Sequence, residues 1–146
     1  MIVLDAYALV ALLADEPAAE EVAGLIAGSA AAVPAPNLAE AADRLARVHG
    51  IPVARTRATV ELLEGSGDVR VVALGPDQAW RAAELRTTYY HRTRCPLSLG
   101  DCLLIASVAG ADQLVTSDGY VLQTAAHEGI AWTALPDSQG ARHDPV

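Results

Sequence analysis

The sequence contains no lysine, and all ten of its basic residues are arginines. A Walker A phosphate-binding loop needs a lysine to reach the phosphates of its nucleotide. Receiver domains and dehalogenase-type phosphatases also place a lysine beside their aspartates. A G-x-G-x-x-G dinucleotide-binding turn is absent as well. Mechanisms that demand a lysine, and cofactor sites that demand this glycine pattern, are therefore excluded.

Cysteine is scarce, with only Cys95 and Cys102 present. Two cysteines are too few for a disulfide scaffold, and these two are too isolated for a zinc site. The four histidines show no metal-binding spacing either. We therefore interpret both cysteines as small hydrophobic side chains or exposed thiols.

Long apolar runs are also absent, although hydrophobic residues make up 52% of the sequence. No run reaches the roughly 18 residues that a membrane helix needs. The start of the chain has neither a basic region nor a signal cleavage site, so we expect a cytoplasmic protein without membrane contacts. Its length predicts a single domain over residues 1–135, followed by a disordered polar tail over residues 136–146.

Acidic residues outnumber basic ones by 18 to 10, which gives a net charge of −8. This balance argues against binding nucleic acid through bulk electrostatic attraction. It remains compatible with a nucleic-acid enzyme whose acids are partly neutralised by bound metal.

Short apolar runs alternate with helical patterns, which predicts an α/β fold with a mostly parallel, roughly five-stranded sheet. The predicted strands are Ile2–Leu4, Ala31–Val33, Val69–Ala73, Leu114–Thr116 and Ile130–Leu135. The predicted helices are Ala6–Leu13, Pro17–Gly28, Asn37–His49, Val53–Leu63, Pro76–Tyr89 and Ser98–Ala109, and a last one from Asp118 to Gly129.

Four acidic residues lie at predicted helix starts, and each has a structural explanation of its own. Asp5 and Asp118 follow strands and are placed to cap the next helix. Asn37-Leu-Ala-Glu40 and Ser98-Leu-Gly-Asp101 have the spacing of a capping box. Taken singly, none of the four needs a catalytic role.

Considered together, the four acids are expected to lie close to one another. The strands of a parallel sheet all end at one edge, and the following helices begin there. Ligands of open α/β folds bind at that edge. Four converging carboxylates repel one another unless a cation lies between them. Oxygen ligands favour a hard divalent cation such as Mg²⁺, with Mn²⁺ as a possible substitute.

The motifs around these acids resemble those of PIN-domain ribonucleases, and more narrowly those of VapC toxins from toxin–antitoxin pairs. The motifs are Val3-Leu-Asp5-Ala-Tyr-Ala-Leu9, Asn37-Leu-Ala-Glu40-Ala, Leu97-Ser-Leu-Gly-Asp101-Cys and Val115-Thr-Ser-Asp118-Gly-Tyr. The resemblance spans about residues 1–135. It implies a three-layer αβα fold, Mg²⁺-dependent cleavage of RNA, a VapB-like antitoxin as partner and a homodimer.

The resemblance and the positions together suggest a role for each acid. Asp5 and Asp101 are the best candidates for metal ligands. Glu40 either binds the metal directly or orients a metal-bound water, and Asp118 is a ligand or reaches the metal through water. Thr116 and Ser117 stand beside Asp118. They either hydrogen-bond a water or phosphate, or are ordinary residues of a strand end and turn.

Two pairs of arginines are candidates for contacts with the RNA backbone. Arg92 and Arg94 lie in the basic loop before the Asp101 helix, and Arg44 and Arg47 lie beyond Glu40 on its helix. The alternative for both pairs is a solvated, salt-bridging surface. For the whole chain the alternatives are a PIN-like nuclease acting in RNA processing or on DNA, and a non-catalytic module that binds metal or a partner.

Overall fold

The computed structural model describes residues 1–145 and contains one five-stranded sheet in the order β3-β2-β1-β4-β5. Every pair of neighbouring strands is parallel. The strands are β1 (Ile2–Leu4), β2 (Ala31–Pro34), β3 (Val69–Val72), β4 (Gln113–Thr116) and β5 (Ala131–Ala134). The predicted α/β class is confirmed, and all five strands lie where the apolar runs placed them.

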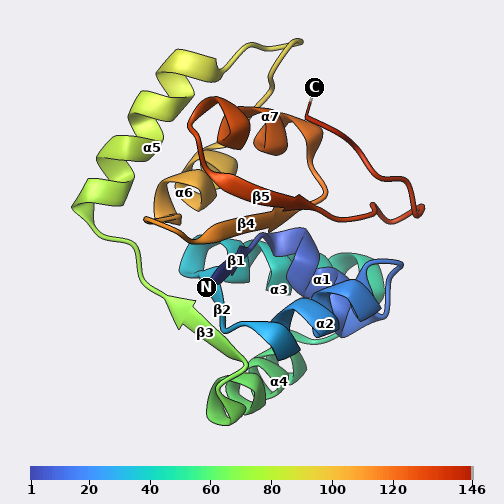
Figure 1. Ribbon diagram of the computed structural model, residues 1–146. Coiled ribbons are helices and arrows are strands. Elements are labelled where there is room, and N and C mark those ends of the chain that lie inside the picture. Colours follow the sequence, from blue (N-terminus) through green and yellow to red (C-terminus); the bar gives the residue numbers. More distant parts are fainter. Residues whose placement is uncertain (146) are drawn as a thin grey trace.

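Helices cover both faces of the sheet (Figure 1). The first layer contains α1 (Ala6–Ala14), α2 (Ala19–Gly28), α3 (Ala35–His49) and α4 (Val53–Ser66), and the second contains α5 (Pro76–Tyr89), α6 (Leu99–Ser107) and α7 (Gly119–His127). Among residues 1–145, no helix combines the length and apolar character needed to cross a bilayer.

The central strand β1 shows why the sheet needs two helical layers. Successive side chains of a strand point to opposite faces. Ile2 and Leu4 accordingly belong to the core beneath α1–α4, whereas Val3 belongs to the core beneath α5–α7. A strand that is buried on both faces reads as an unbroken apolar run. The expected three-layer αβα arrangement is therefore confirmed.

The strand order reverses between β1 and β4. From β1 the chain adds β2 and then β3 on one side, and afterwards β4 and β5 on the other. The loops after β1 and β4 consequently lead to helices on opposite faces and leave a crevice at the carboxyl edge. Asp5 follows β1 and Asp118 follows β4, so both acids lie at this switch point.

The predicted start of the helix that carries Glu40 is wrong. The sequence placed Asn37 at the start of a helix, in a capping box with Glu40. Helix α3 instead begins at Ala35, directly after Pro34, with Pro36 in its first turn. Proline suits the first turn because its φ angle is already helical and it has no N–H to leave unpaired. Asn37 is therefore inside the helix, where its side chain is buried.

The polar segment after β5 makes specific contacts with other parts of the chain. Residues Pro136 and Arg142 form a β-bridge, and the Arg142 guanidinium pairs with Glu21 of α2. The Tyr7 hydroxyl donates to the carbonyl oxygen of Pro136 over 3.0 Å. The composition of the segment shows that it has few apolar side chains to bury. It does not show polar contacts with distant helices.

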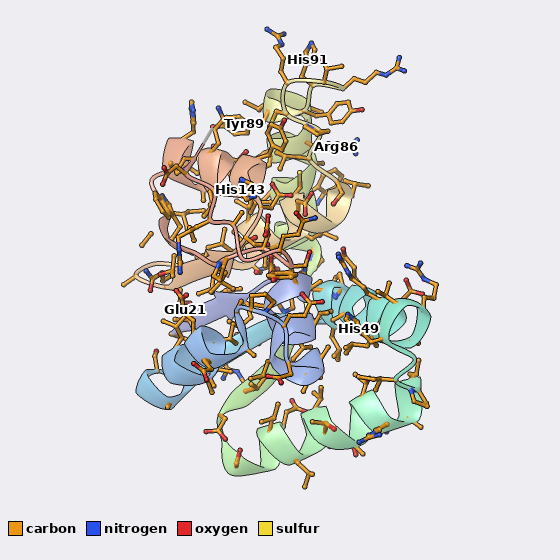
Figure 2. The ribbon with its side chains drawn as sticks, turned by 90° about the vertical axis from the view of Figure 1, so that its right-hand side faces the viewer. Glu21, His49, Arg86, Tyr89, His91 and His143 are labelled. Atoms are coloured by element: carbon orange, nitrogen blue, oxygen red, sulfur yellow. The ribbon has the colours of Figure 1, made fainter. Side chains whose placement is uncertain are left out.

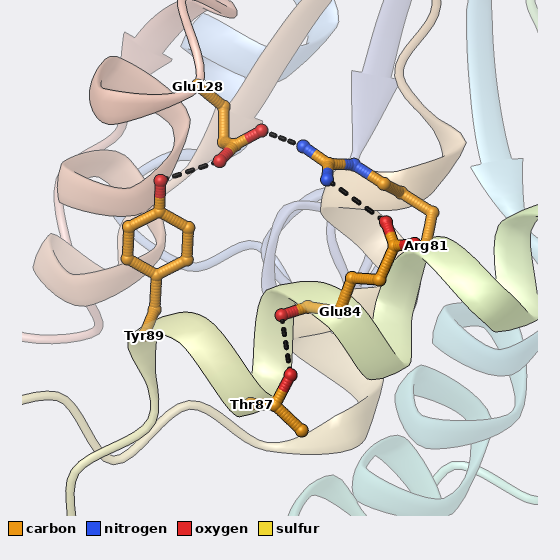
Figure 3. Close-up of polar contacts among 5 residues, drawn as sticks. All are labelled: Arg81, Glu84, Thr87, Tyr89 and Glu128. Atoms are coloured by element: carbon orange, nitrogen blue, oxygen red, sulfur yellow. Dashed lines mark hydrogen bonds and ion pairs between the residues drawn. The ribbon is translucent and has the colours of Figure 1, made fainter.

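A polar cluster joins α5 to the end of α7 (Figure 3). The Tyr89 hydroxyl donates to Glu128 over 2.6 Å, and Arg81 pairs with the same carboxylate. Arg81 also reaches Glu84 on its own helix at 3.4 Å. These contacts fix the outer helix α5 against the body of the second layer, and they occupy the hydroxyl of Tyr89.

Candidate active site

All four predicted acids line one open cavity of about 210 Å³ at the carboxyl edge of the sheet. Asp5 follows β1 and Asp118 follows β4, while Asp101 lies in the first turn of α6 and Glu40 in α3. The structure therefore brings together four side chains that are spread over 114 positions. Figure 2 shows the side chains of the molecule in a view turned by 90° from that of Figure 1.

Asp5 is the most deeply buried of the four acids, with 8% of the residue exposed. Its Oδ1 caps α1 by accepting from the Ala8 amide over 2.6 Å, and its Oδ2 accepts from the Thr116 hydroxyl. Burial raises the pKa of Asp5 from 3.8 to about 7, against the effect of these hydrogen bonds. The charges of Asp101 and Asp118 add to the rise. A carboxylate in this position favours a proton or a bound cation.

Asp101 lies at the electrostatic centre of the cluster. Its own pKa is raised by burial, and the charge of Asp118 adds to that rise. Its charge in turn raises the pKa of Asp5 and of Glu40. The predicted capping box is confirmed here, because Ser98 N–H donates to Asp101 Oδ2 over 2.7 Å and Asp101 N–H donates to Ser98 Oγ over 3.0 Å.

The two exposed acids differ in what they contact. Asp118 Oδ1 caps α7 by accepting from the amides of Tyr120 and Val121 at 2.8 and 3.2 Å. Glu40 makes no capping bond. Its Oε2 lies 3.6 Å from the place that a Cβ on residue 100 would take, so Glu40 reaches the first turn of α6. Helix capping thus accounts for three of the acids and leaves Glu40 unexplained.

The oxygen donors of the cavity fit a hard divalent cation in character. Across residues 1–145, however, no three His, Cys, Asp or Glu side chains lie close enough together to hold a metal ion by themselves. Mg²⁺ commonly binds through one or two carboxylates and completes its shell with waters and substrate phosphate. Asp5 and Asp101, the two more buried acids, are the side chains present that fit such partial coordination.

Comparison with known proteins assigns the sequence to a family. The PIN domain family matches residues 2–127, a stretch that runs from β1 to α7 and includes all four acids. The chain belongs to the PIN-domain family. No curated protein matches the sequence.

Solved structures share the fold of this PIN domain at low sequence identity. VapBC-1 from nontypeable Haemophilus influenzae matches with a TM-score of 0.64 and 17% identity, covering 92% of this chain and 98% of that chain. FitAcB from Neisseria gonorrhoeae gives 0.62 and 19%, with coverages of 90% and 96%. VapC20 of Mycobacterium tuberculosis, a sarcin–ricin loop cleaving toxin, gives 0.57 and 19%, with coverages of 89% and 85%. The predicted resemblance to VapC-type PIN domains is confirmed at the level of the fold.

Thr116 and Ser117 differ in their position in this PIN domain. Thr116 is fully buried, its hydroxyl donates to Asp5, and its oxygen accepts from the Asp118 amide over 3.1 Å. It therefore holds two of the acids in place and is not available for direct contact with a phosphate. Ser117 lines the cavity, where a hydroxyl can contact a ligand.

The predicted arginines of the PIN domain fall into different surroundings. Arg44 lines the carboxylate cavity, and its charge lowers the pKa of Glu40 against the larger effect of burial. Arg47 is paired with Asp43 on the exposed face of α3. Arg92 and Arg94 are exposed in the loop after α5, and neither lines that cavity. Of these four, only Arg44 borders the site.

Sequence reasoning did not assign a site role to several residues that line the cavity. Asn37 is buried, and no hydrogen-bond partner within the described chain reaches its Oδ1. Its spacing of three from Glu40 places both on one face of α3, and this spacing could have predicted a site role for Asn37.

Tyr7, which also lines the cavity, follows Asp5 by two positions. Asp137 and Ser138 enter from the segment after β5, and nothing in the sequence pattern predicted their approach.

Proposed function

We propose that this PIN domain is a metal-dependent endoribonuclease, the toxin of a VapBC-type toxin–antitoxin pair. The single observation that supports the proposal best is the convergence of Asp5, Glu40, Asp101 and Asp118 on one cavity at the β1–β4 switch point. A non-catalytic module whose acids only cap helices would not need Glu40 there. RNA as the substrate class is supported by family membership and by the neighbour described as a sarcin–ricin loop cleaving toxin.

The proposed chemistry is hydrolysis of a phosphodiester bond. When bound, Mg²⁺ supplies Lewis-acid polarisation of the phosphate and activation of a water nucleophile. Asp5 and Asp101 would hold the ion, and Thr116 fixes the Asp5 carboxylate for that task. Glu40 would orient the attacking water or bind the ion, and Asp118 would contact the ion directly or through water. Arg44 and Ser117 line the same cavity and would contact the phosphate.

Cleavage of a circular RNA tests this function, since an exonuclease cannot begin on a molecule without ends. We expect cleavage with Mg²⁺ or Mn²⁺ and none after chelation, with recovery when the metal is restored. Cleavage that persists in excess chelator would contradict the metal-dependent mechanism. Absence of cleavage on every RNA tried would favour the binding module, and preferential cleavage of DNA of the same sequence would favour a DNA nuclease.

The partners follow from the same proposal. A further solved structure that shares the fold is described as a toxin–antitoxin complex from Klebsiella pneumoniae. We propose a VapB-like antitoxin, a homodimer and a cytoplasmic place of action for this chain. An antitoxin-like reading frame directly upstream in the genome would distinguish a toxin from a nuclease of RNA processing.

The loop arginines Arg92 and Arg94 are proposed as outlying contacts to the RNA backbone. Both are exposed, and neither has an ion-pair partner within residues 1–145. A guanidinium that is free of partners can pair with phosphate in a bidentate manner. Neither lines the cavity of the four acids, so an RNA strand would contact them only where it extends beyond the cleaved bond.

A further inference from the structure

We infer that residues 136–145, here called the C-terminal strap, form a wall of the carboxylate cavity that limits which RNA can reach the acids. The inference rests on the proposed ribonuclease function. The strap leaves the end of β5, projects past the carboxyl edge of the sheet and turns back toward α7 (Figure 1). It therefore lies at the edge where the four acids meet.

The strap borders the site directly. Asp137 and Ser138 line the carboxylate cavity together with Ser117 and Asp118. A second cavity of about 550 Å³ adjoins it, and Ser117, Asp118 and Asp137 line both. Arg142 and His143 of the strap also line this second cavity. The strap thus stands on the Asp118 side of the site.

The carboxylate of Asp137 serves the shape of the strap. Its Oδ1 accepts from the amides of Gln139 and Ala141, both at 2.9 Å. Its Oδ2 lies 2.9 Å from His143 Nε2. The hydrogen bond with His143 is the largest cause of the lowered pKa of Asp137. Asp137 therefore closes a compact turn beside the catalytic acids.

Two contacts with the first helical layer hold the strap in place. Arg142 pairs with Glu21 of α2 through bonds of 2.8 and 3.1 Å, and its guanidinium also donates to the Ala134 carbonyl. The second contact is the Tyr7–Pro136 hydrogen bond. We call the Arg142–Glu21 pair the latch; Glu21 and His143 are both labelled in Figure 2.

The strap lies beyond the stretch that the PIN family matches, which ends at residue 127. A fixed wall beside the acids admits a narrow, flexible strand more easily than a rigid duplex. Unpaired RNA can splay its bases and turn its backbone into such a site. We infer that the latched strap favours single-stranded RNA, and that its release admits structured RNA.

The latch can be broken and rebuilt by exchanging charges. Glu21→Arg and Arg142→Glu each place like charges across the contact, and the double variant restores an opposite-charge pair. The pair is partly exposed, so each single variant should shift the strap toward its open state by up to about fivefold. Neither residue touches the carboxylate cavity, which makes the double variant a matched control.

The wall itself is tested without nuclease activity. In an Asp118→Cys background, the thiol is labelled with iodoacetamide and with a bulky polyethylene-glycol maleimide, and the unsubstituted chain measures the background from Cys95 and Cys102. The quantity compared is the labelling rate with the maleimide divided by the labelling rate with iodoacetamide. We expect each single latch variant to raise this ratio and the charge-swapped double variant to lower it again. An unchanged ratio in both single variants would contradict the inference that the strap forms a wall of the cavity.

The effect on substrate choice is tested with Asp118 intact. The ratio of stem-loop cleavage to cleavage of an unstructured oligonucleotide should rise in each single latch variant and fall back in the double variant. A constant ratio in variants whose strap opens by the thiol test would overturn the selective role. If the parent chain cleaves neither RNA, the proposed function fails, while the thiol test still decides whether the wall exists.

Discussion

Replacing Asp101 by asparagine is expected to lower RNA cleavage by at least about a hundredfold while the fold stays intact. Asp101 lies at the electrostatic centre of the cluster, where its charge acts on both Asp5 and Glu40. Asparagine has the same shape, and its amide oxygen can still accept from the Ser98 N–H. The substitution removes the charge and preserves the helix cap. Initial rates at saturating Mg²⁺, beside circular dichroism spectra, measure the effect.

Asp77→Asn is the matched control for this substitution. Asp77 is also an acid in the first turn of a helix, but it is exposed on α5 and does not line the carboxylate cavity. Its replacement should leave the cleavage rate within about twofold, since surface substitutions of this kind change little. Near-normal cleavage by the Asp101→Asn variant would remove Asp101 from the proposed machinery.

The second large effect is on stability in the absence of metal, which should fall as the pH rises from about 4 to 8. Asp5 keeps its proton up to a pKa of about 7 in the folded protein, compared with 3.8 for an ordinary aspartate. Between these values the folded state binds more protons than the unfolded state. The free energy of unfolding therefore decreases with pH, by on the order of 4 kcal/mol over the full window.

Urea unfolding in chelator at pH 5 and pH 8, for the parent chain and for Asp5→Asn, isolates this contribution. Asparagine cannot ionise, so the variant should be more stable than the parent chain at pH 8, and this advantage should shrink toward pH 4. Saturating Mg²⁺ should stabilise the parent chain at pH 8 and have little effect on the variant. Parallel pH profiles of the two proteins would contradict the buried, raised-pKa state of Asp5.

The features that the sequence predicted best are those set by local pattern. The apolar run Ile2–Leu4 predicted a doubly buried strand, and the spacing of Ser98 and Asp101 predicted a capping box that the structure contains. Convergence of the acids followed from the common direction of parallel strands. These inferences need only the periodicity of the chain and the rule that ligands bind at the carboxyl edge.

The features that the sequence missed depend on contacts between distant segments. The burial of Thr116 against Asp5 joins residues 111 positions apart, and no local pattern marks it. The contact of Arg142 with Glu21 spans 121 positions and gives the strap its place. The helix start at Ala35 was missed for another reason, since proline fits a helical first turn as readily as a strand end.

Asp5 and Asp101 are proposed to hold a divalent cation between them. Anomalous difference density from crystals grown with Mn²⁺ tests this claim most directly, because the signal locates the ion without relying on activity. We predict a peak between Asp5 and Asp101 that disappears in the Asp5→Asn variant. A saturated crystal with no peak in this cavity, or with Mn²⁺ bound only elsewhere, would contradict the account.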